Sequence, residues 1–354
     1  MGRSTEEIIQ EKVPLAGKTT IGLGGTAKLF AHCESVEELT SVLNHAIRDR
    51  LRFTILGGGS NVIFPDGDFD GLVIRIGMKG YRFETVSGGV LLDTAAGEEW
   101  DPLVSECVAR RLGGIECLSG IPGLVGATPM QNVGAYGQEV AETIQTVEAL
   151  DLSSMKPVEF TNADCQFGYR QSRFKRTDKG RFVITRVKFL LNPDGRPALR
   201  YAELRKQVES RKSGSVDLAT VREIVLTLRK EKSMVIDPDD PNCRSVGSFF
   251  MNPVVTRKIF LELQQRWGES GGVSDIPSFP EGDDLKIPAA WLVEQSGFRK
   301  GFRKGGVGIS ANHALALVNY GGSTSELLSL ADGIIEAVQR RFSILLQVEP
   351  SVVS

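Results

Sequence analysis

Residues 119–140, SGIPGLVGATPMQNVGAYGQEV, contain five glycines and two prolines and no Lys, Arg or His. Glycine permits left-handed backbone conformations and close approach of the main chain to another group. A loop that transfers phosphate would need a lysine and a metal ligand. We therefore expect this stretch to contact an anionic ligand through backbone amides, without lysine.

A second glycine cluster, GGGSN at 57–61, directly follows the predicted buried strand at 52–56. Small consecutive residues after a strand can turn and direct several backbone N–H groups at one anion. Ser60 and Asn61 add side-chain donors. The same residues are also typical of a glycine-rich hairpin turn, which is the alternative interpretation. The presence of two neutral glycine clusters favours a ligand held along its length, such as a dinucleotide.

A third match, GLGGTA at 22–27, fits the glycine pattern of a Rossmann dinucleotide site. In a Rossmann site this pattern follows a hydrophobic strand and leads into the first turn of a helix. Here GKTTI precedes it and KLFAHCES follows it. We therefore interpret this match as a coincidence in a chain with 39 glycines.

Composition narrows the class of protein. A length of 354 residues predicts two or three domains, and a net charge of −2 argues against nucleic acid and anionic membranes as partners. The first residues lack the apolar core of a signal peptide, and no apolar run is long enough to span a membrane. The five cysteines are scattered and the three histidines form no ligand pattern. We expect a cytoplasmic protein without a metal site.

Helices and strands are predicted without strict alternation, which indicates an α+β fold. Helical periodicity or capping signals mark residues 35–50, 98–111, 217–232, 255–267, 287–297 and 325–342, and strand-like runs lie at 52–56, 143–150, 182–190 and 314–319. A capping box is expected at Ser35 and Glu38, and the second helix is expected to end at Gly113 and Gly114. The chain is expected to divide into residues 1–75, 76–232 and 233–354.

Five ordered segments give the chain a wider resemblance. They are LGGGSNVIFPDGDFDGLVI, GIPGLVGATPMQNVGAYGQEV, CQFGYRQSRFK, GSFFMNP and IPAAWLVEQSGF. In this order and at these spacings the chain resembles the UDP-N-acetylenolpyruvoylglucosamine reductase (UDP-N-acetylmuramate dehydrogenase) family, from about residue 17 to about 350. QNVGAYG and the segment around LRYAEL are similar to the longer of the two family types.

The resemblance implies a fold and a cofactor. Residues 1–75 and 76–232 would form a two-part FAD-binding fold of the vanillyl-alcohol-oxidase type, and 233–354 an α+β substrate-binding domain whose last strand returns to the active site. FAD would be held without a covalent bond, since neither glycine loop contains a histidine. The implied FAD contacts are Gly57, Gly58, Gly59, Ser60, Asn61, Ile121, Pro122, Gly123, Gly126, Gln131, Asn132 and Gly134.

The resemblance also implies a reaction, in which NADPH is the co-substrate and UDP-N-acetylglucosamine enolpyruvate is reduced. Arg170 would bind an oxyanion, Ser248 would donate the proton and Glu349 would stabilise the enol intermediate. The family tends to place a second acid after the proline that follows this glutamate, whereas this chain has Ser351. Substrate contacts are implied for Tyr201, Lys232, Asn252 and Gln295.

Two alternatives remain open at this point. Another FAD-dependent oxidoreductase of the same superfamily would keep the glycine loops without needing Ser248 and Glu349. A catalytically silent nucleotide-sugar-binding protein would not need all three catalytic candidates. We expect a monomer.

Overall fold

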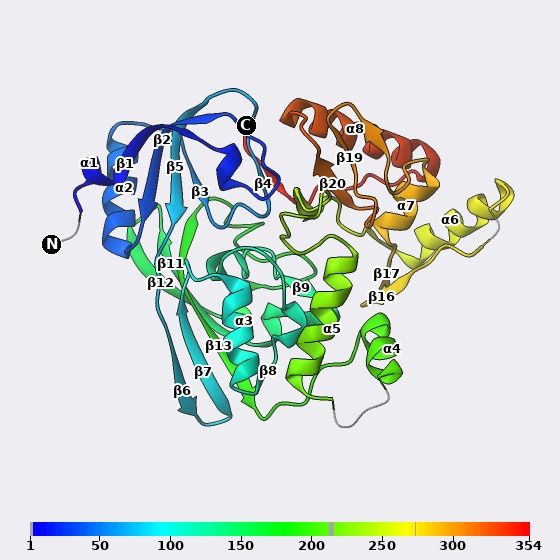
Figure 1. The fold of residues 1–354 in the computed structure, drawn as a ribbon, viewed down its shortest axis with the longest axis horizontal. Helices are drawn as coiled ribbons and strands as arrows, with labels where there is room; N and C mark the ends of the chain where they lie inside the picture. The colour runs from blue at the N-terminus through cyan, green and yellow to red at the C-terminus, as the bar shows by residue number, and fades with distance from the viewer. Residues whose placement is uncertain (1–2, 212–215, 273) are drawn as a thin grey trace. The chain divides into compact units, whose positions relative to one another are not determined.

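The computed structural model describes residues 3–211, 216–272 and 274–354 and groups the chain into two compact units. The first unit consists of Met1–Pro14, Thr26–Gly59 and Asp68–Val235, and the second of Leu15–Gly25, Ser60–Gly67 and Ile236–Ser354. Each unit contains both helices and sheets, which confirms the α+β prediction (Figure 1).

The first unit begins with a four-stranded sheet in the order β1-β2-β5-β3. Its strands are β1 (Ile9–Pro14), β2 (Thr26–Cys33), β5 (Phe69–Ile76) and β3 (Phe53–Leu56), and the last three run parallel. A short helix α1 (Thr5–Ile8) precedes β1, and α2 (Val36–Arg48) connects β2 to β3. Because β2 follows GLGGTA as a strand, the helix required by a Rossmann site does not form there.

Helix α2 confirms the helix predicted at 35–50, with a change at its start. The Ser35 side chain accepts the N–H of Glu38, as expected for the N-cap. The Glu38 carboxylate accepts the N–H of Glu34 and ion-pairs with Arg3, rather than closing the predicted box. The helix buries Ala46 and leaves Ile47 half exposed, so Ala46 lies on its apolar face.

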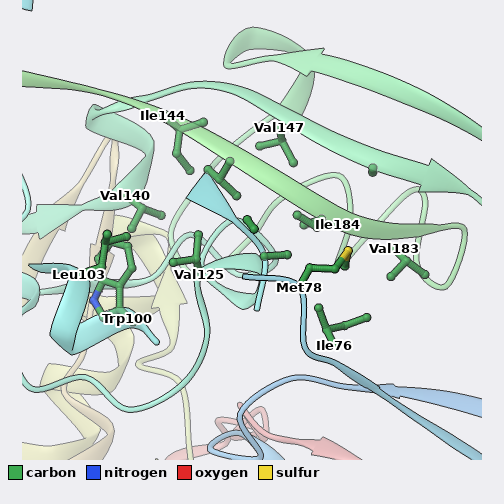
Figure 2. Packing of buried hydrophobic residues seen from close by; sticks show 14 of the residues in the cluster. Ile76, Met78, Trp100, Leu103, Val125, Val140, Ile144, Val147, Val183 and Ile184 are labelled. Atoms are coloured by element: carbon green, nitrogen blue, oxygen red, sulfur yellow. The ribbon is translucent and has the colours of Figure 1, made fainter. Parts of the chain in front are cut away.

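A larger antiparallel sheet in the same unit has the path β12-β11-β13-β7-β6, with β8 paired to β13. The predicted strands at 143–150 and 182–190 form β11 (Ile144–Asp151) and β13 (Phe182–Pro193). The other strands are β12 (Lys156–Thr161), β7 (Gly89–Ala95), β6 (Tyr81–Val86) and β8 (Leu112–Gly113). Figure 2 shows Val147 and Ile184 of this sheet within the main hydrophobic core, which also contains Trp100.

Helix α3 (Trp100–Ala109) packs into this core but ends earlier than predicted. Its C-cap is Arg110, and the left-handed residue after it is Arg111, with a φ of 61°. Gly113 lies instead in β8, because Leu112 and Gly113 pair with the end of β13. The prediction of a glycine C-cap was therefore wrong, since pairing across the sheet determines the conformation of Gly113.

The first unit also contains short elements around the glycine-rich segment and two helices after β13. These are the strands β9 (Gly134–Ala135) and β10 (Gln138–Glu139), the 3-10 helices η2 (Glu116–Leu118), η3 (Val125–Ala127), η4 (Val140–Glu142) and η5 (Ala163–Cys165), and the helices α4 (Ala202–Ser210) and α5 (Leu218–Glu231). Asp217 caps α5 by accepting the N–H of Thr220. Helices α4 and α5 share a small core with Cys117 of η2.

The second unit contains an antiparallel sheet in the order β14-β20-β19-β18, on which α8 packs. Its strands are β14 (Ser245–Ser248), β20 (Ala316–Asn319), β19 (Val307–Ile309) and β18 (Arg303–Lys304). A second sheet has the order β15-β17-β16, formed by Val254–Val255, Asp284–Lys286 and Phe279–Glu281. The helices are η1 (Ala16–Lys18), α6 (Arg257–Glu269), α7 (Ala289–Gln295) and α8 (Thr324–Phe342), the last with a complete capping box at Ser323.

A parallel pair of strands joins two distant parts of the second unit. Strand β21 (Ser351–Val352) pairs with β4 (Val62–Ile63), which follows the GGGSN cluster. The sequence predicts three parts, whereas the structure groups residues 15–25 and 60–67 with the C-terminal part. Pairings of this kind join residues almost 300 positions apart, so local sequence does not reveal the grouping.

Candidate active site

The two glycine clusters meet in the first unit. A Cβ atom added to Gly58 would lie 2.7 Å from the Cα atom of Gly123, closer than real Cβ atoms approach. Gly123 has a φ of 126° and Gly59 a φ of 73°, conformations that favour glycine. A Cβ added to Gly57 would have only Ala127 within 4 Å, at 3.8 Å. Glycine at 58 is therefore required by loop-to-loop contact, while position 57 leaves room beside the backbone.

The segment after Gly123 is held by the turn between β7 and α3. The N–H of Val125 donates to the Glu98 carbonyl and the N–H of Gly126 to the Ala96 carbonyl, both at 2.9 Å. A Cβ on Gly126 would lie 2.6 Å from the Cβ of Ala96. These two N–H groups are already bonded within the protein, and the glycine at 126 has an internal packing reason. The anion nest predicted for this loop does not extend to them.

Asp101 fixes the beginning of the same segment. Its carboxylate accepts the N–H of Gly120 at 2.6 Å and ion-pairs with Arg222 of α5 at 2.6 Å. Burial by itself would raise the pKa of Asp101, but the hydrogen bonds from Arg222 and Gly120 outweigh it and hold the pKa below its usual value. Asp101 thus links α3, the glycine-rich segment and α5 through one charged group.

The polar residues in the middle of the segment hold its shape. Asn132 is buried in a left-handed conformation, and its Nδ2 donates to Glu139 at 2.6 Å and to the Gly168 carbonyl at 3.1 Å. Its Oδ1 accepts the N–H of Ala141. Gln131 accepts a hydrogen bond from Lys175 at 3.3 Å. Asn132 therefore has a structural task, whatever it contributes to cofactor binding.

Arg170 lies at the end of this network. It occupies the turn closed by Gly168 and Gln171 and has a φ of 53°, which is uncommon outside glycine. Its Nη2 donates to the Gly134 carbonyl at 2.7 Å, and its guanidinium lies 5.6 Å from the Tyr169 ring centroid. Unusual backbone conformations of this kind concentrate at functional sites. Arg170 is attached to the glycine-rich segment rather than standing alone on the surface.

Tyr201 and Lys232 lie close together in the first unit. Tyr201 is the N-cap residue of α4 and 44% exposed, and Lys232 is the C-cap residue of α5. The Tyr201 ring meets Tyr136 edge-on at 5.4 Å, and the Lys232 ammonium lies 5.8 Å from the Tyr136 ring centroid. Lys232 also ion-pairs with Glu203 of α4 at 2.5 Å. These four side chains connect α4, α5 and the glycine-rich segment.

Arg229 is a further cation beside this group. Its Nη2 donates to the Met234 carbonyl at 2.7 Å, while its Nε is buried without a partner among the described residues. A Cβ on Gly120 would lie 3.3 Å from that Nε. Burial lowers the pKa of Arg229 because desolvation disfavours the charged form, yet guanidinium remains a cation. A buried, unpaired N–H beside a glycine is a candidate anion-binding donor.

Sequence reasoning missed Tyr136, Glu203 and Arg229. Arg229 and Lys232 are three residues apart, so they lie on one side of α5, and this spacing could have indicated the pair. Tyr136 is the one tyrosine within residues 119–140. Burial raises the pKa of Tyr136 to about 12, so its phenol is neutral at physiological pH. Glu203 gives no sequence signal, because its role depends on how α4 packs against α5.

In the second unit the structure brings Ser248 and Glu349 onto neighbouring segments. Ser248 ends β14 directly after Gly247, whose φ is 77°, and the pairing with β20 shifts register there. The N–H of Glu349 donates to the carbonyl of Phe249 at 2.9 Å, and Phe250 forms a bridge with Val348. Glu349 is thus paired with Phe249, the residue directly after the predicted catalytic Ser248.

Asn252 and Gln295 lie at opposite ends of α7. The Asn252 Oδ1 accepts the N–H of Ala289 at 2.8 Å and so caps the helix from outside, since the N-cap residue Pro288 makes no side-chain cap. Gln295 is the last residue of α7. From Ala289 to Gln295 the helix rises about 9 Å along its axis, which is six steps of about 1.5 Å. The structure connects the two residues through α7 but does not place them side by side.

Comparisons with known proteins decide the family. The C-terminal domain model of UDP-N-acetylenolpyruvoylglucosamine reductase matches residues 237–353, and an FAD binding domain model matches residues 27–154. A UDP-N-acetylenolpyruvoylglucosamine reductase of Thermobifida fusca is 43% identical over 347 residues, covering 96% of this chain and 97% of that protein. The chain belongs to the UDP-N-acetylenolpyruvoylglucosamine reductase family.

Other members of the family agree with this result. The reductase of Mycobacterium tuberculosis is 40% identical over 358 residues, covering 98% of this chain and 95% of that protein. The crystal structure of the reductase from Thermus caldophilus has a TM-score of 0.64 at 23% identity and covers 98% of this chain and all of that chain. The second comparison supports the fold alone.

Membership makes this chain an FAD-dependent oxidoreductase. The matched FAD binding region, residues 27–154, contains the Gly57–Gly59 loop and the glycine-rich segment at 119–140. The room beside the Gly57 backbone suits a flavin bound against this loop. Within residues 3–211, 216–272 and 274–354, no group of three acidic, cysteine or histidine side chains could hold a metal ion, and no helix could cross a membrane.

Proposed function

We propose that this chain reduces the enolpyruvyl double bond of UDP-N-acetylglucosamine enolpyruvate, with NADPH as the electron donor, to give UDP-N-acetylmuramate for peptidoglycan synthesis. The antiparallel pairing of residues 249–251, which directly follow Ser248, with residues 347–349 carries this proposal. It agrees with the names of the relatives that match nearly the whole chain. Bound FAD would supply the hydride chemistry.

The remaining chemistry falls to side chains of the protein. Hydride delivered to the terminal carbon of an enolpyruvyl group leaves negative charge on the neighbouring carbon and its carboxylate. Ser248 would donate the proton to that carbon. Glu349 would stabilise the enol form through a hydrogen bond, directly or through water. Arg170 would direct its forked N–H groups at the carboxylate, which a lysine could not reproduce.

The two glycine loops would hold the cofactor. Gly57, Gly58 and Gly59 with Ser60 and Asn61 would take the pyrophosphate through backbone and side-chain donors. Ile121, Pro122, Gly123 and Gly126, with Gln131, Asn132 and Gly134, would flank the ring system. We infer a shape-forming part for Gly126 and Asn132, because their contacts within the protein are extensive.

Substrate binding would use the aromatic and cationic group in the first unit. Lys232 and Arg229 would meet the diphosphate, and Tyr201 would cover the nucleotide sugar. Lys232 must then exchange its ion pair with Glu203 for the substrate anion. In the second unit, Gln295 and the Nδ2 of Asn252 would donate hydrogen bonds, since the Oδ1 of Asn252 is already used in capping α7.

The proposed substrates suit the cytoplasm, where NADPH and nucleotide sugars occur. The cysteines agree with a reducing compartment, because Cys33, Cys107, Cys117, Cys165 and Cys243 are all free thiols.

Separate measurement of the two half-reactions tests the proposal. Ser248→Ala should leave NADPH-dependent bleaching of the flavin absorbance near the wild-type rate, because the serine has no task in that half. Reoxidation by the enolpyruvyl substrate should slow by roughly 10²–10⁴-fold, as for a lost general acid. Ser248→Cys should recover part of the rate. A variant slow only in the NADPH half would refute the assignment of Ser248.

A further inference from the structure

The last seven residues before Ser354 take part in two different pairings. On one side, Met251 donates its N–H to the Gln347 carbonyl and Glu349 donates to the Phe249 carbonyl, both at 2.9 Å. On the other side, Ser351 donates its N–H to the Asn61 carbonyl at 3.0 Å and Val353 donates to the Ile63 carbonyl at 2.9 Å. The C-terminal segment therefore bridges the Ser248 strand and the end of the GGGSN cluster.

Pro350 separates the two pairings and is buried. A residue that precedes proline is restricted to extended conformations. Glu349 is thus constrained by the following proline, by its own N–H bond to Phe249 and by the bond of Ser351 to Asn61. The direction of the Glu349 side chain depends on both pairings.

The Ser351 side chain is exposed, whereas its backbone N–H is bonded to Asn61. The bond needs only a residue other than proline at this position. A change of side chain at position 351 therefore leaves this backbone contact in place.

We propose that the pairing of Ser351–Val353 with Asn61–Ile63 is a positioning device that connects the flavin-binding loop to Glu349. This inference rests on the proposed function of Glu349 and of Asn61. The pairing holds Asn61 in its cofactor-binding conformation and holds Glu349 in place for the substrate half-reaction. Ser351 and Val353 act through these two residues and do not touch the reacting atoms.

The test removes single N–H groups. Ser351→Pro deletes the donor to Asn61, and Ser351→Ala keeps it as the matched control. In Ser351→Pro, flavin fluorescence titration of the apoprotein should give an FAD dissociation constant about tenfold higher. At saturating FAD, the substrate half-reaction should slow at least tenfold with little change in substrate KM, while the NADPH half stays within twofold. A chain ending at Pro350, which introduces no proline clash, should behave in the same way.

A double-mutant comparison separates positioning from a general loss of structure. If Ser351 acts through Glu349, then Ser351→Pro should slow the substrate half-reaction no further in a Glu349→Gln background. Additive effects would overturn the inference, as would a Ser351→Pro variant that matches Ser351→Ala in both FAD affinity and rate. A Glu349→Gln enzyme with the wild-type rate would instead refute the proposed function of Glu349.

Discussion

Alanine at Gly58 should lower the stability of the apoprotein, whereas alanine at the adjacent Gly57 should lower the affinity for FAD. Neither has a positive φ among the described glycines, so alanine carries no backbone strain at either position. At Gly58 the new Cβ would lie 2.7 Å from Gly123 Cα, whereas ordinary contact begins at 3.4 Å, so the loops must separate by about 0.7 Å. Overpacking of this kind costs about 1–3 kcal/mol.

Gly57→Ala meets only Ala127 at 3.8 Å. The apoprotein should therefore be as stable as wild type, or more stable by about 0.4–1 kcal/mol, because alanine restricts the unfolded chain. If the flavin lies against Gly57, FAD affinity should fall by roughly 5–150-fold, which corresponds to the same 1–3 kcal/mol of overpacking. In Gly58→Ala the apoprotein itself should lose stability.

Thermal unfolding of both apoproteins and FAD titration by flavin fluorescence measure the two quantities. The loss in Gly58→Ala should lower Tm by about 2–4 °C for each kcal/mol. An unchanged FAD dissociation constant in Gly57→Ala would exclude Gly57 from the cofactor site. A wild-type apoprotein Tm in Gly58→Ala would contradict the close contact of the loops. Gly126→Val is a poor probe of the cofactor site, because any Cβ added at this position would clash with Ala96 in the apoprotein itself.

Three further changes test the neighbouring groups. Tyr201→Ala should weaken substrate binding by about 1–3 kcal/mol through lost stacking and a lost hydrogen bond, with FAD content unchanged, and equal substrate dissociation constants would place Tyr201 outside the site. Glu203→Gln should tighten substrate binding up to about fivefold, because it releases Lys232 from a partly exposed ion pair. Weaker binding would show that Glu203 does not compete with the substrate for Lys232. Asp101→Asn should destabilise the protein by about 1–3 kcal/mol at pH 7. Because the folded pKa of Asp101 is lowered, this contribution is present above the usual carboxylate pKa of about 4 and is lost as pH falls through the folded pKa, so unfolding curves of variant and wild type should converge in acid.

The sequence was sufficient for elements whose signals are local. The helices predicted at 35–50, 217–232 and 325–342 form α2, α5 and α8. Their N-cap residues Ser35, Asp217 and Ser323 each accept a backbone N–H three residues ahead, and the first of these caps was predicted. The strands β11 and β13 follow their runs of β-branched residues. The family and its cofactor also followed from the sequence, because the ordered motifs keep their spacing. The two glycine clusters were also visible in the sequence, and Gly58 of the first lies against Gly123 of the second.

The sequence alone did not reveal what depends on distant pairing. It predicted a glycine C-cap after α3, where pairing with β13 places Gly113 in a strand instead. It named Lys232 but not Arg229 or Glu203, whose environment is set by the packing of α4, α5 and the glycine-rich segment. It assigned roles to Asn132 and Asn252 without showing that both already bond to the backbone.

Residue types, their order and their local spacing thus determined the helices, the glycine loops and the chemistry that this chain can perform. Tertiary structure alone decided that Glu349 pairs with Phe249, directly after Ser248, and that Ser351 pairs with Asn61. The physical reason is the range of the interactions. Caps and helical faces are settled among residues three or four positions apart, whereas these pairings join segments about 100 and 290 residues apart. Their register is fixed by the burial of a whole hydrophobic core, which no short stretch of sequence contains.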